Sequence, residues 1–182
     1  MIKWLEKLPL CIEIRKSSSE KKDNYNNKVI TMIADLNTMP EIYWYCRKKF
    51  FNNDLPDPNF DIIHSFKVMA RFTFRKAKKK DKKKKGKKWK PLEYKCISFS
   101  DYFDFDEETF INIMAHEMIH YYILEHEIKD NKPHGREFMR IAQELNEKYG
   151  LHITKKVDGS KIPLSPHAPK VVFRPKRKWW FW

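Results

Sequence analysis

The spacing of hydrophobic residues changes several times along the chain, and each change predicts a different element. From about residue 25 the hydrophobic residues fall on one helical face, which predicts a first helix. A second helix is predicted from Thr38, because Thr38-Met-Pro-Glu41 has the form of a capping box with proline where no amide donor is needed. This helix is expected to end near Asn52-Asn53-Asp54. The apolar faces consist of Val29, Ile30, Ile33 and Leu36 in the first helix and Ile42, Tyr45, Cys46 and Phe50 in the second.

Two extended segments follow, and a run of lysines separates them. Residues 60–75 are predicted to be extended, because hydrophobic and polar residues alternate towards the end of this range and place Phe72 and Phe74 on one face. Residues 94–99 are the second strand candidate. The lysine-rich residues 76–90 lie between the two, so we expect a long exposed hairpin loop there.

The next predicted helix is apolar around most of its circumference. Asp106 is expected to cap it, and it extends to about Leu124. A helix that is apolar on nearly every face belongs in a core. A last helix is predicted over residues 135–149, ended by Gly150. Its inward-facing residues are expected to be Phe138, Met139, Ile141, Ala142 and Leu145.

Charge is distributed unevenly over the 182 residues. The formal net charge is +14; residues 76–90, with eleven lysines and one aspartate, contribute +10, and residues 170–182 contribute +5. The remainder therefore sums to −1, which indicates a nearly neutral folded body with two basic appendages. The length and the 41% of hydrophobic residues suffice for one compact domain with a core.

Cysteine usage and hydropathy limit the class of protein further. The three widely spaced cysteines, Cys11, Cys46 and Cys96, provide neither a disulfide framework nor a Cys-x-x-Cys zinc ribbon, so we expect buried thiols. No stretch approaches the roughly 18 to 20 apolar residues of a membrane span. The first residues are too charged for the apolar region of a signal peptide. We therefore expect a cytoplasmic protein without a membrane partner, and separately we expect a monomer.

Polar residues interrupt the buried helix at His116-Glu-Met-Ile-His120. Residues i and i+4 of a helix lie on the same face, so both imidazoles can bind one metal ion, with Glu117 within the same arc of roughly 100°. This is the zinc-protease pattern, in which the glutamate acts as general base towards a water activated by the metal. Three polar groups inside an apolar helix cost free energy unless they have such partners. We therefore predict a site for one zinc ion.

The third metal ligand has several candidates downstream. His126 would lie about 240° around a continuous helix from His120, out of reach of the same ion. Glu137 and Glu144 would each require the last helix to face the site in the right orientation. His134 fits better, because it opens the last helix after a connection long enough to turn the chain back.

The segments His116-Glu-Met-Ile-His120 and His134-Gly-Arg-Glu-Phe138 resemble the SprT-like domain family, found in bacterial SprT proteins and in the DNA-dependent protease Spartan. Phe50-Phe-Asn-Asn-Asp-Leu-Pro56 and Cys96-Ile-Ser-Phe-Ser100 are similar more loosely. The resemblance covers about residues 25–155. It implies a zinc metalloprotease with ligands His116, His120 and His134 and with Glu117 as the catalytic residue. In Spartan the domain cleaves proteins crosslinked to DNA.

The resemblance also implies the fold class and the domain organisation. We expect a zincin-like α+β domain over residues 25–155, with a small antiparallel sheet packed on helices that include the one carrying His116 and His120. An N-terminal segment, 1–24, precedes it, and a basic, aromatic tail, 156–182, follows it. Many SprT proteins carry a C-terminal four-cysteine zinc ribbon, whereas this sequence has no cysteine after Cys96.

The two basic segments are candidates for binding nucleic acid. Lysines attract phosphates without reading sequence, and the tail adds aromatic residues on which single-stranded bases can stack. The predicted contact residues are Lys79, Lys80, Lys83, Lys84, Lys87, Lys88, Arg174, Lys176, Arg177 and Lys178. The favoured function is a zinc metallopeptidase acting on proteins associated with or crosslinked to DNA. The alternatives are a nucleic-acid-binding module with a structural or inactive zinc site, and a hydrolase of another bond.

Overall fold

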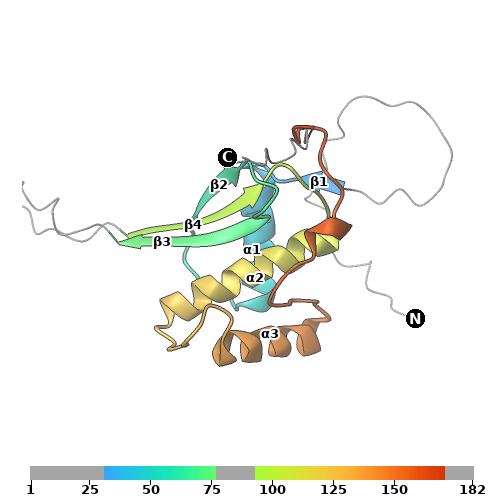
Figure 1. Cartoon of the computed structure of the whole chain (residues 1–182). Helices are drawn as coiled ribbons and strands as arrows, with labels where there is room; N and C mark the ends of the chain where they lie inside the picture. Colours follow the sequence, from blue (N-terminus) through green and yellow to red (C-terminus); the bar gives the residue numbers. More distant parts are fainter. Residues whose placement is uncertain (1–30, 77–92, 171–182) are drawn as a thin grey trace, which may run out of the picture.

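The computed structural model describes residues 31–76 and 93–170, which form an α+β structure (Figure 1). The α+β class expected from the sequence is thus confirmed. Helix α2 is central: it contacts α1, α3, β3 and β5, and it lies between the larger sheet and α3. The elements in chain order are β1 (Thr31–Ile33), α1 (Thr38–Phe50), β2 (Asn59–Ile63), β3 (Ala70–Lys76), β4 (Glu93–Ser100), β5 (Asp104–Asp106), α2 (Glu107–Glu125), α3 (Arg136–Tyr149) and the short 3₁₀ helix η2 (Gly159–Lys161).

The larger sheet is mixed, with the strand order β2-β4-β3. Strand β3 pairs antiparallel with β4, from Ala70 opposite Phe99 to Lys76 opposite Glu93. Strand β2 pairs with the other side of β4 and is parallel to it. The prediction of an antiparallel sheet is therefore wrong for β2. Alternating hydrophobic residues reveal a strand, but the direction in which it pairs depends on the path of the connecting loop.

The predicted first helix is wrong over its described part, residues 31–36. Thr31–Ile33 forms β1, which pairs antiparallel with β5, and Leu36 is exposed. Strand β5 was not predicted either. Each of these strands has three residues, too few to show a period, and each is stabilised by a partner far away in the sequence. The first part of the predicted helix lies outside the described residues.

Helix α1 begins at Thr38 itself, so the capping box predicted with Thr38 as the cap is wrong. The Asp35 carboxylate accepts hydrogen bonds from the amides of Asn37 and Thr38, both at 2.7 Å, so the acceptor at this helix start comes from a residue before the helix. The predicted end is confirmed, because the helix stops before Asn52 and Asn53. Their φ angles of 49° and 59° are left-handed, a conformation that asparagine tolerates.

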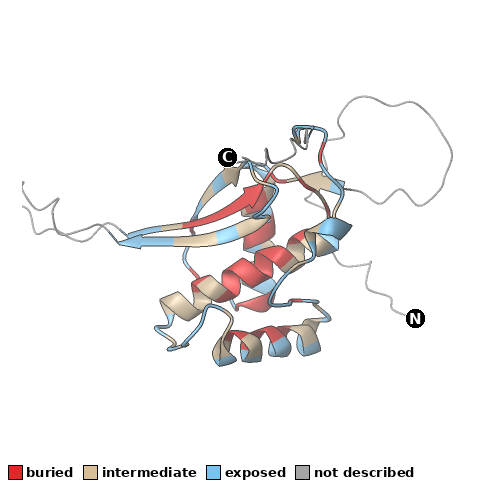
Figure 2. Ribbon diagram, in the orientation of Figure 1, coloured by how far each residue is buried: buried red, intermediate tan, exposed pale blue. Residues whose placement is uncertain are grey.

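The core lies between the larger sheet and the helices, and α2 contributes to it along much of its length (Figure 2). Cys46 and Cys96 are both buried, as predicted, and burial raises the pKa of the Cys46 thiol. Cys11 lies outside the described residues. The largest fully buried side chains are Tyr43, Tyr121, Phe99, Phe105, Phe110, Phe138, Met39, Leu55, Ile97, Met114, Met118 and Ile119.

Both helices that were predicted downstream of the sheet are confirmed. The carboxylate of Asp106 accepts from the Thr109 amide at 2.7 Å and so caps α2. Helix α3 ends at Gly150, whose φ of 69° is the left-handed conformation typical of a helix C-terminus. Four of the five residues predicted to face inward from α3 are buried, and Met139 is half-buried.

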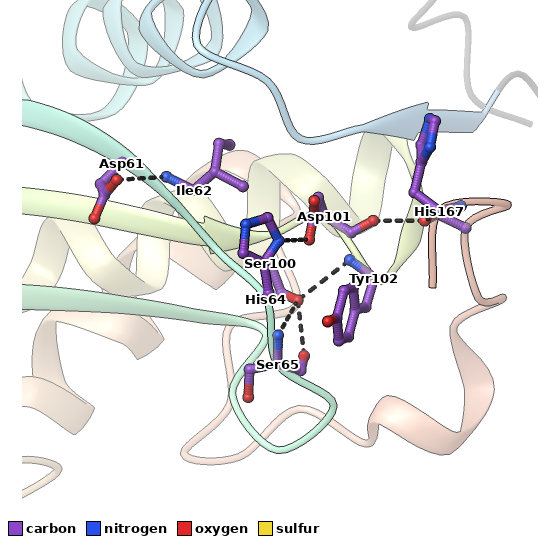
Figure 3. A network of polar contacts seen from close by, with 9 residues as sticks. Asp61, Ile62, His64, Ser65, Ser100, Asp101, Tyr102 and His167 are labelled. Carbon is purple, nitrogen blue, oxygen red and sulfur yellow. Dashed lines mark hydrogen bonds and ion pairs between the residues drawn. The ribbon is translucent and has the colours of Figure 1, made fainter. Parts of the chain in front are cut away.

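Polar contacts at one end of the sheet hold the segment that follows η2 (Figure 3). The Ser165 amide donates to the Tyr102 carbonyl at 3.0 Å, and the Ser165 hydroxyl donates to the Asp101 carbonyl. Beside them, His64 Nδ1 lies 2.9 Å from Asp101 Oδ1, and the Ser100 hydroxyl donates to the Ser65 carbonyl at 2.7 Å. The first part of the predicted tail, as far as Ser165, therefore packs on the domain. Within the described ranges, no helix combines the length and the apolar character needed to cross a membrane.

Candidate metal centre

Three imidazole rings converge where α2 faces the start of α3. His116 and His120 lie one turn apart on α2, and His134 immediately precedes Gly135 at the N-terminal end of α3. Nε2 of His134 lies 3.0 Å from Nε2 of His116 and 3.1 Å from Nε2 of His120. One ligand atom from each residue lies within 4.8 Å of the other two. These are the three histidines that the sequence grouped as metal ligands.

The spacing of the three nitrogens fits a divalent metal ion. Nitrogens that share a tetrahedral zinc ion, each at about 2.0 to 2.1 Å, lie about 3.3 to 3.4 Å from one another. The observed 3.0 and 3.1 Å separations approach that value. Imidazole is a good ligand for zinc and also for copper, iron and nickel. The donor set therefore fits a transition metal, with zinc as the ion that commonly takes three histidines in hydrolytic sites.

A main-chain carbonyl fixes the orientation of the first histidine. Nδ1 of His116 lies 2.9 Å from the carbonyl oxygen of Thr154. Because a carbonyl only accepts hydrogen bonds, Nδ1 must carry the proton, and Nε2 presents its lone pair to the space shared by the three rings. Histidine ligands are usually held by such a partner on the second nitrogen.

The surroundings keep all three histidines in the neutral form. Burial, reinforced by the neighbouring His134, lowers the pKa of His116 to about 4. Burial also lowers the pKa of His120 to about 4, with smaller contributions from His116 and His134. The pKa of His134 is lowered by burial and then by Lys155. Since a histidine must be neutral to bind a metal, the site is ready for an ion at neutral pH.

The carboxylate of Glu117 lies between α2 and strand β3. Its Oε2 accepts a hydrogen bond from the amide of Phe72 at 2.7 Å. Burial raises the pKa of Glu117 to about 7, although the Phe72 amide acts in the opposite direction. A carboxyl group with a pKa near neutrality can both accept and return a proton at physiological pH.

An aromatic ring from α3 supports the three imidazoles. The ring centroid of Phe138 lies 4.8 Å from those of His116 and His120 and 4.7 Å from that of His134. Phe138 is fully buried, so this side of the histidine cluster is closed to water. A metal at the cluster would therefore be approached from another side.

A cleft of about 980 Å³ opens onto the histidines. Phe72 and Phe74 of β3 form part of one wall, and Ile123 and Leu124 of α2 form part of the other. Among the described strands, β3 lies at the edge of the larger sheet. The cleft is thus bordered by apolar side chains and by a strand with one side not paired in that sheet.

The other candidates for a third ligand lie elsewhere. His126 Nε2 faces Asp54 Oδ2 at 2.9 Å, beyond the end of α2. Glu137 and Glu144 both form ion pairs with Arg140. The grouping that can hold a metal therefore includes His134 and none of these three residues.

The predicted nucleic-acid contacts belong to the two basic segments. All of them, from Lys79 to Lys88 and from Arg174 to Lys178, lie outside the described residues. The strands on either side of the lysine-rich segment are placed, and Lys76 pairs with Glu93 in the antiparallel ladder. The segment therefore connects neighbouring strand ends, as expected for a hairpin.

Two helices of a small α+β domain bring together three neutral histidines and a buried glutamate. The protein therefore belongs to the class of proteins with a candidate metal-binding centre. The family model described as SprT-like matches residues 41–157, and the chain belongs to this family. The match extends from α1 to beyond Thr154 and includes the three histidines and Glu117. The family predicted from the sequence is confirmed. A comparison with curated proteins finds no match.

Several contacts that support the cluster were not predicted from the sequence. They are the amide of Phe72, the carbonyl of Thr154 and the carboxylate of Asp130, which contacts the start of α3. Main-chain groups carry no residue-specific signal, so the first two could be found only from the fold. For Asp130, the one signal in the sequence is the glycine that follows His134.

Proposed function

We propose that this protein is a zinc-dependent metallopeptidase, with His116, His120 and His134 as metal ligands and Glu117 as general base. The observation that carries the proposal is the convergence of three neutral imidazoles beside a buried glutamate whose pKa is raised to about 7. Membership of the SprT-like family supports it, because this family is associated with metalloprotease-like domains. A zincin-like arrangement, with the catalytic glutamate between two histidines of one helix, belongs to the same proposal.

The residues of the chain perform defined steps in this mechanism. When bound, zinc supplies Lewis acidity that promotes attack of water on the carbonyl carbon of a peptide bond. Glu117 accepts the proton that the water gives up and returns it to the amine nitrogen as the carbon–nitrogen bond breaks. The Phe72 amide holds one carboxylate oxygen of Glu117 in place. The Thr154 carbonyl keeps His116 in the tautomer that binds metal.

The cleft favours an extended polypeptide as the substrate. An extended peptide can add to the edge of a sheet through main-chain hydrogen bonds, and β3 is an edge strand that borders the cleft. The apolar side chains of Phe72, Phe74 and Ile123 offer contacts to the side chains of such a peptide. A protein substrate therefore fits the cleft better than a small polar molecule does.

The test is metal content and casein cleavage for wild type and for His134→Ala, Glu117→Gln and Glu144→Gln. Wild type is expected to hold about one zinc per chain, and His134→Ala to lose it. Glu117→Gln is expected to keep the metal and lose cleavage, whereas Glu144→Gln, at an exposed ion pair, keeps both. Wild type without bound metal, or full activity in Glu117→Gln, would contradict the proposal.

We further propose that the basic segments bind nucleic acid and bring the peptidase to proteins associated with DNA. Residues 76–90 carry +10, against −1 for the chain outside the two basic segments. Lys76, the first residue of this segment, and Glu93, shortly after its end, line the same cleft as the histidines. Nucleic acid held there would lie beside the mouth of the candidate site.

Deletion of residues 78–88 tests this second proposal. Counterion release makes the logarithm of affinity fall linearly with the logarithm of salt concentration, with a slope of about −0.7 per phosphate contact for single strands. The deletion is expected to weaken binding of single-stranded DNA and to flatten this slope, while casein cleavage without DNA is kept. An unchanged slope would end the proposal. If wild type bound zinc and single-stranded DNA but cleaved no casein, with or without DNA, a binding module with a structural or inactive zinc site would replace the peptidase.

A further inference from the structure

The amide groups at the start of α3 bind a carboxylate from the loop before it. The first amides of any helix lack partners within the helix, and a residue at the cap position usually supplies an acceptor. Here the cap position is Gly135, which has no side chain. Asp130 takes over this role: its Oδ2 accepts from the Glu137 amide at 3.0 Å and from the Phe138 amide at 3.1 Å.

The absence of a side chain at Gly135 is what admits this carboxylate. A Cβ at this position would lie 1.7 Å from Oδ1 of Asp130 and 2.4 Å from its Cγ. The backbone of Gly135 has φ −81° and ψ −157°, an extended conformation that any residue adopts. The need for glycine therefore comes from the seated carboxylate of Asp130 and not from backbone strain.

Two residues of the metal centre depend on this arrangement. His134 is bonded directly to Gly135, so the turn that Asp130 closes sets the direction of its ring. Phe138 donates its own amide to Asp130 and places its ring against all three imidazoles, with centroids at 4.7 and 4.8 Å. Asp130 does not belong to the group of metal-binding candidates. Its hydrogen bonds to the amides of Glu137 and Phe138 link it to the backbone that carries His134 and Phe138.

We propose that Asp130 is a positioning residue of the metal centre, whose carboxylate holds His134 and the ring of Phe138 where the ion requires them. The inference rests on the proposed function, because it assumes that the histidines bind a metal. The amides of Phe138 and Glu137, among other backbone amides, lower the pKa of Asp130, so the side chain is charged at neutral pH. A negative charge also suits the positive end of the α3 dipole. Substitution of residues that orient metal ligands typically weakens metal affinity by about 10- to 100-fold.

The test measures Co²⁺ and Zn²⁺ binding by the metal-stripped full chain. Co²⁺ is a suitable probe because its visible absorption reports the geometry of its ligands. Asp130→Ala is expected to weaken Co²⁺ affinity by about 10- to 100-fold and to change the visible spectrum. Asp130→Asn, which keeps an acceptor oxygen, is expected to restore affinity to within about threefold of wild type. If Asp130→Ala does not fold, Gly135→Ala, which displaces the same carboxylate, provides the measurement.

Asp106→Ala is the matched control, because Asp106 is likewise a capping aspartate but caps α2 at the end away from the histidines. It is expected to lower the midpoint of thermal unfolding while leaving Co²⁺ affinity and spectrum as in wild type. A merely structural role for Asp130 predicts the same behaviour for Asp130→Ala. Wild-type affinity and spectrum in Asp130→Ala would therefore overturn the inference.

A double-mutant cycle with Gly135→Ala gives a second, independent outcome. Gly135→Ala alone is expected to weaken Co²⁺ binding to about the same extent as Asp130→Ala, because the new methyl group displaces the carboxylate. In the Asp130→Ala background the same change is expected to cost little further affinity. Additive losses would overturn the inference. If wild type itself bound neither Co²⁺ nor Zn²⁺, the proposed function would fail, and the inference with it. If wild type bound metal and the Asp130 variants bound it equally well, only the inference would fail.

Discussion

The described residues contain two groups of histidines that are held in opposite ways. His64, His126 and His152 are exposed, and each faces a carboxylate: Asp101 at 2.9 Å, Asp54 at 2.9 Å and Glu108 at 3.8 Å. His116, His120 and His134 are buried or half-buried and face one another at 3.0 and 3.1 Å.

The difference separates histidines that face surface carboxylates from histidines placed for a ligand. A carboxylate favours the protonated imidazole, whereas burial among other imidazoles favours the neutral one. Although burial acts against it, the Tyr122 carbonyl and Asp54 raise the pKa of His126. The pKa values of His116 and His120 fall to about 4. Only the second group has nitrogen lone pairs that converge on one point and are open to a cation.

The largest expected effect is the difference in zinc affinity between two single variants, each lacking one histidine from one of the two groups. His116→Ala is expected to weaken zinc affinity by more than about 100-fold, because a direct ligand counts for more than the outer residues that orient it. His64→Ala is expected to leave zinc affinity unchanged and to alter stability by less than about 1 kcal/mol, as for an exposed surface side chain. Competition with a chromophoric chelator measures the first, and denaturant unfolding the second. Equal zinc affinity in the two variants would remove the distinction between the groups.

Glu117→Gln is expected to stabilise the metal-free protein in a pH-dependent way. The pKa of Glu117 is raised from the ordinary 4.5 to about 7, so the folded state prefers the protonated form. The stability linked to this proton is fully present below pH 4.5 and is lost as pH rises through about 7. Glutamine has no charge to bury, so the variant is expected to gain about 1 to 3 kcal/mol at pH 8 and little at pH 4.5.

Denaturant unfolding of chelator-treated wild type and variant, from pH 4.5 to pH 8, measures this gain. Glu144→Gln, at an exposed ion pair on α3, is the control and is expected to show no comparable dependence on pH. A constant difference between wild type and Glu117→Gln across this range would contradict the assigned pKa. The same variant is expected to be inactive, so the residue would lower stability while it supports catalysis.

The parts of the fold that the sequence predicts are those in which one segment determines its own structure. Helices α2 and α3 were predicted with nearly their observed ends, because each has a long apolar pattern and a local cap, Asp106 or Gly150. Strands β1 and β5 were not, because three residues acquire strand geometry only by pairing with each other. The parallel direction of β2 likewise depends on contacts that no local pattern records.

The candidate site likewise combines residues that one segment places with contacts that depend on the whole fold. His116, Glu117 and His120 are spaced by one helix, so their proximity follows from helix geometry alone. His134 was favoured because the connection to it is long enough for the chain to return. The amide of Phe72 and the carbonyl of Thr154, which hold the Glu117 and His116 side chains, belong to the backbone. Any residue type supplies such groups, so only the fold reveals which of them are used.

A smaller effect on the metal centre is expected from Asn146→Ala. Its side chain accepts from the Ile153 amide at 2.8 Å and donates to the Ile153 carbonyl at 3.0 Å. These two bonds fix the backbone directly before Thr154, whose carbonyl orients His116. We expect zinc affinity to fall about tenfold and stability to fall by about 1 to 2 kcal/mol.

The control for this substitution is Gln143→Ala on the same helix. Gln143 is exposed, and its side chain bonds only to the side chain of Glu147 among the described residues, at 2.8 Å. Its removal is expected to change neither zinc affinity nor the spectrum of bound Co²⁺. If Asn146→Ala lost stability but bound zinc as tightly as wild type, the carbonyl of Thr154 would not depend on this clamp.

The smallest effect concerns His126, and its pH dependence has the opposite sign to that expected for His116 and His120. Because the pKa of His126 is raised, its pairing with Asp54 stabilises the fold most below the unfolded-state pKa of about 6.5 and is lost as pH rises through the folded-state value. The site is partly exposed and screened by solvent, so His126→Gln is expected to cost less than about 1 kcal/mol at pH 5.5 and less still at pH 9. Added salt should reduce the difference.

The depressed pKa values of His116 and His120 predict the reverse for the metal-free cluster, whose contribution is lost as pH falls from about 6.5 towards 4. Unfolding measured for His126→Gln, Asp54→Asn and the double variant isolates the pair, and a coupling that grew with rising pH would show that His126 does not prefer the charged form while His116 and His120 prefer the neutral one.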